Sequence, residues 1–279
     1  MVLPAVAVTA IGSLDARHLV PWLAVVVAIV VPAAGSLVLL THLVRDPHHG
    51  IRQDLRAVID TVAGQPAGQT LLLEGADAGT RPGEPAALFD MRMAAAYGLT
   101  RNPAASVEGL NTTITGVSPM GQHSTPLVRP ATAWTTVLSS RPGPFGAGRR
   151  VQRRFGGFTL SAAPVSGLDA TDYGVGWSVP HRVDDRLAQD VHGDNEILVS
   201  NAGSAGRVVT LTLRARGLDG PARLTLSAWR APGRTVAVAD RWTTVALRLP
   251  VPAGGVAPVS VAVPGTHGIS VSGVVVSEG

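Results

Sequence analysis

The pattern of hydrophobic and polar positions divides the chain into an apolar start, a middle part with helical periods and a long region of alternating residues. The longest apolar run, Leu19 to Thr41, has twenty-three residues without a formal charge. As a helix it would be about 34 Å long, enough to cross the ~30 Å hydrocarbon core of a bilayer. We predict a transmembrane helix at about residues 19–41, since buried core helices are usually shorter and less uniformly apolar. Residues 1–14 have the pattern of the tail of a second membrane helix before it.

Helical and strand periods alternate up to about residue 168. Apolar residues recur at helical spacing over Ile51 to Ala63, and Gln69 to Glu74 has the pattern of a short buried strand. A second helix is predicted from Pro85 to Tyr97, with Gly98 just past its end. Further strands are predicted at 135–139, 150–155 and 158–160, and a long loop at 101–130. This order predicts a small α/β domain.

The rest of the chain has the pattern of an antiparallel β-sandwich. Alternating segments occur at 196–200, 208–213, 223–228, 235–238, 243–249, 259–263 and 269–276. Glycine and proline turns separate them at a spacing typical of a sandwich, here of jelly-roll type. The predicted fold class is therefore a membrane-anchored α+β protein with three parts. These are a membrane segment at 1–45, an extracytoplasmic α/β domain at 46–168 and a β-sandwich at 169–279.

Composition removes several chemistries. The chain has no cysteine and no lysine, so all 23 basic residues are arginine. Disulfides, thiolate sites, a phosphate-binding Walker lysine, Schiff-base chemistry and serine–lysine catalysis are therefore excluded. Richness in alanine, glycine, valine and arginine without lysine is typical of a GC-rich genome, such as that of an actinobacterium. Apart from Arg149, Arg150, Arg153 and Arg154, the net charge of +4 comes without a basic run interleaved with aromatics, which disfavours nucleic-acid binding.

The arginines near the predicted span leave its orientation open. Arg45, Arg52 and Arg56 follow the span closely, and the positive-inside rule alone would place the large C-terminal part in the cytoplasm. However, Arg52 and Arg56 belong to the predicted helix, and large domains translocate with little regard to local charge. We therefore predict a cell-membrane protein whose residues 46–279 are extracytoplasmic.

Two short motifs carry a resemblance to a known family. Arg17-His-Leu-Val-Pro21, at the start of the apolar span, is similar to the entry into late helices of C-type membrane glycosyltransferases, which use polyprenyl-phosphate sugars. The predicted paired strands Thr135 to Ser139 and Arg150 to Leu160, the latter ending Arg-Phe-Gly-Gly-Phe-Thr-Leu, resemble the end of their extracytoplasmic α/β domain. The terminal β-domain looks like the carbohydrate-binding sandwiches of actinobacterial arabinofuranosyltransferases.

The resemblance implies the C-terminal part of such an enzyme, namely its last membrane helix and the extracytoplasmic region. The sequence has no counterpart of the polytopic body that carries the family's catalytic acidic residues. No catalytic residue is therefore carried over.

Four aromatic residues are candidate carbohydrate-binding residues, because sugar C–H groups stack on flat aromatic faces. Trp229 and Trp242 fall out of phase with the apolar positions of their strands, and Trp177 lies near Tyr173 at the start of the sandwich. Packing at an open end of the sandwich is the alternative explanation.

An acidic run is a candidate calcium site, and a solvated acidic loop is the alternative. It comprises Asp184, Asp185, Asp190, Asp194 and Glu196. Its spacing matches no EF-hand loop. Ser118 departs from nucleophile-elbow spacing, and the adjacent His48 and His49 point apart on a helix, so a turn and a solvated linker explain them.

These observations predict a membrane-tethered, extracytoplasmic module of cell-envelope glycan synthesis. It would bind glycan or a polyprenyl-linked sugar, or dock on a polytopic glycosyltransferase, without catalysis or a cofactor of its own unless calcium binds. The alternatives are a C-terminal fragment or subunit of an active C-type glycosyltransferase, a hydrolase with its site in the 101–130 loop, and a structural envelope scaffold.

Overall fold

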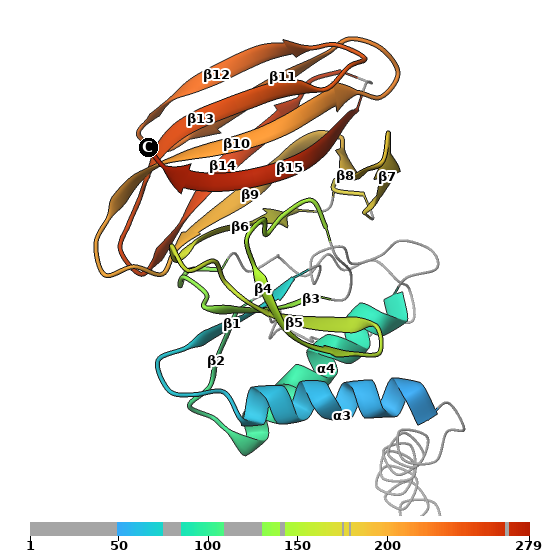
Figure 1. Ribbon diagram of the computed structural model, residues 1–279, viewed down its shortest axis with the longest axis vertical. Helices are drawn as coiled ribbons and strands as arrows, with labels where there is room; N and C mark the ends of the chain where they lie inside the picture. Colours follow the sequence, from blue (N-terminus) through green and yellow to red (C-terminus); the bar gives the residue numbers. More distant parts are fainter. Residues whose placement is uncertain are drawn as a thin grey trace, which may run out of the picture. The chain divides into compact units, whose positions relative to one another are not determined.

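Two helices and fifteen strands in three five-stranded sheets make up the described part of the chain (Figure 1). The computed structural model describes residues 49–74, 85–108, 130–139, 143–174, 176–178, 180–265 and 268–279. The predicted membrane span at 19–41, Ser118 and His48 lie outside these residues. Among the helices of the described ranges, none has both the length and the apolar character to cross a bilayer. Residues Gln53–Gly279 form one compact unit.

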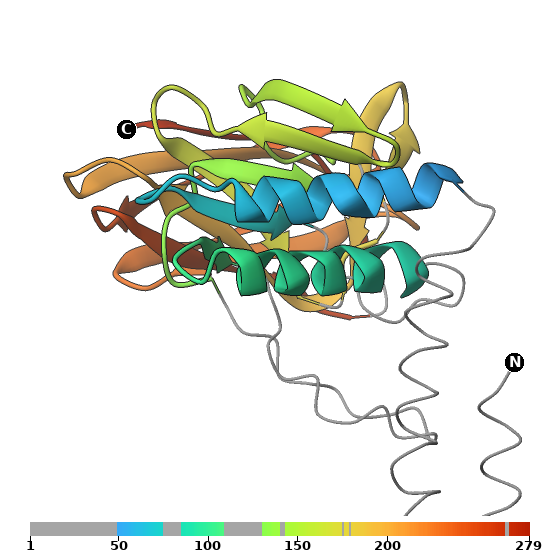
Figure 2. The ribbon, with the colours of Figure 1, turned by 90° about the horizontal axis from the view of Figure 1, so that it is seen from below.

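The mixed sheet has the strand order β2-β1-β3-β5-β4. Its strands are β1 (Thr70–Glu74), β2 (Ser106–Glu108), β3 (Thr136–Ser139), β4 (Arg150–Phe155) and β5 (Phe158–Ala162). Strand β1 pairs in parallel with β2 and β3, whereas β5 is antiparallel to β3 and β4. Helices α3 (His49–Ala63) and α4 (Pro85–Arg101) run side by side along it in Figure 2.

Strand β1 is buried on both faces, which explains its uninterrupted leucines. Leu71 and Leu73 belong to a core shared with α3 and α4, which contribute Val58, Val62 and Met91 among others. Leu72 has the opposite parity and packs with Trp134, Val137, Tyr173 and Leu198. A central parallel strand covered on both faces reads as a continuous apolar run instead of an alternating one.

Helix α4 continues past the glycine that was predicted to end it. Gly98 lies inside α4, and a Cβ at this position would come within 2.6 Å of the Val62 Cβ and 2.9 Å of the Ile59 carbonyl oxygen. Glycine is therefore present because α3 and α4 approach closely there, and its role as a helix stop was a wrong prediction.

The remaining strands form two antiparallel sheets. The inner sheet, in the order β12-β11-β14-β9-β6, comprises β12 (Ala231–Val238), β11 (Ala222–Ala228), β14 (Gly255–Val263), β9 (Gly193–Asn201) and β6 (Leu168–Tyr173). The outer sheet, in the order β13-β10-β15-β8-β7, comprises β13 (Thr243–Val251), β10 (Arg207–Gly217), β15 (Ile269–Glu278), β8 (Arg186–Val191) and β7 (His181–Val183). Alternate residues of both sheets, such as Leu211, Leu213, Val245 and Leu247, fill one shared core. The predicted sandwich is confirmed.

The strand predictions failed where polar residues interrupt the pattern. All seven predicted sandwich strands exist, but β6, β7 and β8 were missed, and β2 lies inside the predicted 101–130 loop. Strand β6 reads Leu-Asp-Ala-Thr-Asp-Tyr, in which Leu168 and Ala170 enter the sandwich core. Its polar residues face the mixed sheet or the end of the sandwich instead of solvent, so apolar periodicity does not reveal it.

Candidate functional site

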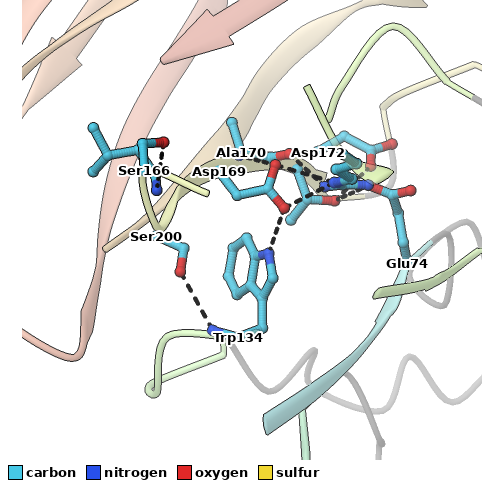
Figure 3. A network of polar contacts seen from close by, with 10 residues as sticks. Glu74, Trp134, Ser166, Asp169, Ala170, Asp172 and Ser200 are labelled. Carbon is cyan, nitrogen blue, oxygen red and sulfur yellow. Dashed lines mark hydrogen bonds and ion pairs between the residues drawn. The ribbon is translucent and has the colours of Figure 1, made fainter. Parts of the chain in front are cut away.

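A buried group of charged side chains joins the mixed sheet to the inner sheet. We call Glu74, Arg149, Asp169, Thr171 and Asp172 the polar junction. Glu74 is the last residue of β1, Arg149 immediately precedes β4, and the other three lie on β6. Figure 3 shows Glu74, Asp169 and Trp134 converging on this point from different elements. The junction therefore connects segments that are far apart in the sequence.

Arg149 is the hub of the polar junction. Its Nε donates to both oxygens of Asp169, at 3.0 and 2.8 Å, and its Nη1 donates to Glu74 Oε1 at 2.7 Å. Its Nη2 donates to the Ala170 carbonyl oxygen at 2.8 Å. The side chains of Arg149, Glu74 and Asp169 are 8%, 10% and 1% exposed. One planar guanidinium thus holds two carboxylates and a carbonyl away from water.

The loop before β4 is shaped to admit this arginine. Gly146 has φ +73°, and a Cβ at this position would overlap the Arg149 side chain. The Arg149 N–H donates to the Gly146 carbonyl oxygen at 3.0 Å, which closes the turn. The same loop inserts Phe145 into the sandwich core, where its ring meets Trp177 edge-on at 5.3 Å. Glycine is required here for its left-handed backbone and for the space it leaves.

Trp134 and Gln189 extend the polar junction through hydrogen bonds to Asp169 and Asp172. The Trp134 Nε1 donates to Asp169 Oδ2 at 2.8 Å, and the Ser200 hydroxyl accepts from the Trp134 N–H at 3.3 Å. The Gln189 Nε2 donates to Asp172 Oδ2 at 2.8 Å. Thr171 Oγ1 lies 3.0 Å from Glu74 Oε1 and 3.4 Å from Asp172 Oδ1. A single hydroxyl proton cannot serve both carboxylates, so the shorter contact to Glu74 takes it.

Burial changes the acid–base behaviour of this cluster. Burial raises the pKa of the Glu74 carboxyl, although the charge of Arg149 opposes the rise. Burial also raises the pKa of the Asp172 carboxyl, against the Gln189 hydrogen bond. For Arg149 burial lowers the pKa, but the charges of Glu74 and Asp169 outweigh it and the net direction is up. The three carboxyls of Glu74, Asp169 and Asp172 face a single guanidinium charge. The raised pKa values therefore favour a proton on Glu74 or Asp172.

The sequence gives little sign of this junction. Arg149 is separated from Glu74 by 75 residues and from Asp169 by 20. In the sequence it belongs to a run with Arg150, Arg153 and Arg154, whose side chains are exposed. Only tertiary contacts distinguish the buried arginine from its neighbours.

A second candidate site lies at the opposite edge of the inner sheet. Ala228 pairs with Ala231, so Trp229 and Arg230 form the two-residue tip of the β11–β12 hairpin. Trp229 is 77% exposed, and the Arg230 guanidinium lies 4.1 Å from the centre of its ring. A cation over one face of an indole holds the ring in place. The ring is thus oriented by Arg230 while most of its surface stays open to solvent.

A groove begins beside this tip, and we call it the hairpin groove. It is lined by residues 230–234 of the tip and β12, residues 246–250 of β13, and Val208, and has a volume of about 580 Å³. Strands β12 and β13 are edge strands of the two sheets, so the groove lies where the sandwich is open. The Arg234 Nη1 donates to the Ala246 carbonyl oxygen at 2.9 Å and so links the two edges.

The other predicted carbohydrate-binding residues have different positions. Trp242 follows the far end of β12, about 26 Å along an eight-residue strand from the tip, so it shares no platform with Trp229. Its Nε1 is buried without a hydrogen-bond partner. Trp177 and Tyr173 are 2% and 8% exposed, and the Trp177 Nε1 donates to the Tyr173 and Glu196 carbonyl oxygens at 3.2 Å. The expectation that Trp177 and Tyr173 present their faces to a glycan is therefore wrong.

The described residues do not form the predicted calcium site. No three acidic or histidine side chains gather within metal-binding reach in the described ranges. Asp184 pairs with Arg216, Asp185 lies in the β7–β8 turn, and Asp190 Oδ1 accepts from the Ser270 hydroxyl at 2.6 Å. Asp194 and Glu196 lie along β9. Strand β8 pairs with β7 and β15, whereas β9 pairs with β6 and β14 in the other sheet, so the carboxylates are dispersed in a way that the linear run could not reveal.

Replacing Arg149 tests the polar junction. Arg149→Met removes the cation and leaves two carboxylates buried, so we expect the free energy of unfolding to fall by about 3–5 kcal/mol in urea titrations. The adjacent Arg150 is exposed, so Arg150→Met is the matched control and should change stability by less than about 0.5 kcal/mol. Equal small losses in both variants would show that the junction contributes nothing.

The raised pKa of Asp172 makes stability depend on pH. A carboxyl whose folded pKa is raised stabilises fully below its ordinary pKa of 3.8, and that contribution is lost as pH rises through the raised value. Asp172→Asn is permanently neutral, so we expect it to lose less stability than wild type between about pH 4 and pH 8. At neutral pH it should be the more stable form, by about 1.4 kcal/mol per unit of pKa shift. The exposed Asp219→Asn is the control, and pH curves of both variants parallel to wild type would refute this.

No protein-family model matches the chain, and no curated protein matches it. Several solved structures show weak similarity. The module TmCBM61 in complex with β-1,4-galactotriose is 14% identical, with 40% of this chain and 88% of that one covered and a TM-score of 0.26. A family 29 carbohydrate-binding module is 13% identical, with 46% and 84% covered and a TM-score of 0.27.

The isomalto-dextranase of Arthrobacter globiformis T6 complexed with panose is 12% identical, with 41% of this chain and 24% of that one covered and a TM-score of 0.30. At these identities and scores, what this chain binds has to be inferred from its own side chains.

Proposed function

We propose that this chain is a glycan-binding module of the cell envelope that contacts its ligand through Trp229 and the hairpin groove. The observation that carries the proposal is the Trp229 ring, which is 77% exposed and covered on one face by Arg230. Exposing an indole to water is unfavourable, and its burial against a ligand would recover that free energy. A flat, fixed ring beside a groove with polar groups suits the apolar faces and the hydroxyls of a sugar.

The hairpin groove supplies the polar groups that such a site needs. The backbone of β12 is an edge, so its outward N–H and C=O groups are free of strand partners on that side. Arg230, over the ring, and Arg234, in the groove, add guanidinium donors. Sugar hydroxyls both donate and accept hydrogen bonds. The C=O groups of β12 can accept from them, and its N–H groups and the two guanidinium groups can donate to them.

We also propose that the module is held at the outer face of the cell membrane by the span at 19–41. It would act there in glycan synthesis with a polytopic C-type glycosyltransferase, either as a docked partner or as the C-terminal part of that enzyme. The support is the sequence resemblance at Arg17–Pro21 and over the strands predicted at 135–139 and 150–160, which correspond to β3 and the β4–β5 hairpin. In this proposal catalysis belongs to the polytopic body, which carries the family's catalytic acidic residues.

Binding of immobilised oligosaccharides by the purified full chain tests the glycan proposal. We expect Trp229→Ala to weaken binding about tenfold, which corresponds to the loss of one stacking contact. Trp242→Ala is the control, because that residue lies at the other end of β12 and should change stability but not affinity. If wild type and Trp229→Ala bind every sugar equally, the ring is not a binding platform.

Protease treatment of intact spheroplasts tests the location. An exposed extracytoplasmic body should be digested without lysis and leave a membrane-held N-terminal fragment. Digestion only after lysis would place residues 46–279 inside the cell and remove the cell-envelope proposal.

A further inference from the structure

The charges lining the hairpin groove all have one sign. Its described lining includes Arg230, Arg234 and Arg248 but no aspartate or glutamate. We infer that the hairpin groove takes an acidic glycan, whose carboxylate or phosphate groups bind these arginines while a sugar ring stacks on Trp229. This inference rests on the proposed glycan-binding function and names the class of glycan.

Several arginines elsewhere in the described chain have carboxylate partners, whereas the groove arginines have none. Arg207 pairs with Glu278, Arg216 pairs with Asp184, and Arg149 is held by two carboxylates. Within the described ranges, no side-chain carboxylate lies within ion-pairing distance of the three groove arginines, so their charge is uncompensated there. Three unpaired like charges around one groove repel each other, and an anionic ligand would relieve the repulsion.

Arg230 and Arg234 are positioned to bind a ligand together with Trp229. Arg230 follows Trp229 directly and lies over its ring. Arg234 is oriented by one hydrogen bond, from its Nη1 to the Ala246 carbonyl oxygen. A guanidinium has five N–H donors, so this bond fixes the group and leaves donors for a ligand. Arg248 lies beside the backbone of Gly279, so the inference depends chiefly on Arg230 and Arg234.

The guanidinium groups of the hairpin groove and the indole of Trp229 together indicate which class of ligand binds there. Guanidinium binds two oxygens of a carboxylate or a phosphate through paired N–H donors, whereas a hydroxyl offers a single uncharged oxygen. An exposed indole adds a flat apolar face, which a bare inorganic anion would not use. A ligand that uses both is a sugar bearing a uronic acid carboxylate or a phosphate ester.

The experiment compares acidic oligosaccharides with their neutral counterparts on one array at low ionic strength. Trigalacturonic acid is paired with its methyl ester, and phosphate-bearing pentose and hexose oligosaccharides are paired with their dephosphorylated forms. We expect the full chain to bind at least one acidic member about tenfold more tightly than its neutral partner. The carboxylate and phosphate pairs distinguish the two acid groups.

Variants separate a specific contact from a general charge effect. Arg234→Gln should weaken binding of the acidic member three- to tenfold, on the order of one charged hydrogen bond, and leave the neutral member unchanged. Arg234→Lys, which keeps the charge, should restore part of the loss. Arg223→Gln makes the same charge change at an exposed residue of β11 and should have no effect.

Three other results would overturn the acidic-glycan inference, and they differ in what they imply for the proposed glycan-binding function. Equal binding of acidic and neutral members, still lost in Trp229→Ala, would refute the acidic ligand and leave the glycan function standing. Binding of no sugar would remove both. Binding of a thymidine oligonucleotide as tightly as the best acidic sugar would show an unspecific polyanion site and refute the assignment.

Discussion

The guanidinium of Arg149 is the contact on which the arrangement of the described residues depends. It joins the end of β1 to β6 by binding Glu74 and Asp169 at once, in surroundings that exclude most water. The neighbouring core of Leu72, Trp134, Val137, Tyr173 and Leu198 packs the same two sheets together. Apolar packing alone tolerates small shifts of one sheet against the other. The buried hydrogen bonds from Arg149 to Glu74 and Asp169 require particular distances and angles, so they allow fewer arrangements. The α/β layer and the sandwich are therefore joined in a defined way.

The edge of the inner sheet that is attached to the mixed sheet is not the edge that forms the proposed ligand site. Strand β6 is one edge of the inner sheet and carries the polar junction, whereas β12 is the opposite edge and lines the hairpin groove. Attaching the mixed sheet near the β6 edge leaves the β12 edge and the Trp229 tip open. An unprotected edge strand is a liability in a folded protein, and Pro232 and Arg234 within β12 discourage its pairing with another strand. The same features leave a polar surface for a ligand.

Local periodicity predicted the parts of the fold that depend on local patterns. The two helices, most strands of the mixed sheet and seven sandwich strands follow from apolar spacing, and the exposure of Trp229 was predicted as well. The polar junction could not be predicted, because Arg149 looks like the exposed arginines next to it. Trp177 was misassigned because Phe145, which packs on its ring, comes from a distant loop. The sequence shows which residues alternate, and tertiary contacts decide which polar groups are buried.

The most direct test of this account is native-state hydrogen exchange, compared across the joint. If the polar junction makes the mixed sheet and the sandwich one cooperative body, the amides of β3 and of β6 should open with the same free energy, close to that of global unfolding. If the amides of β3 exchange through an opening several kcal/mol smaller, while those of β6 remain protected, the two layers are independent. That result would contradict the central role given to Arg149.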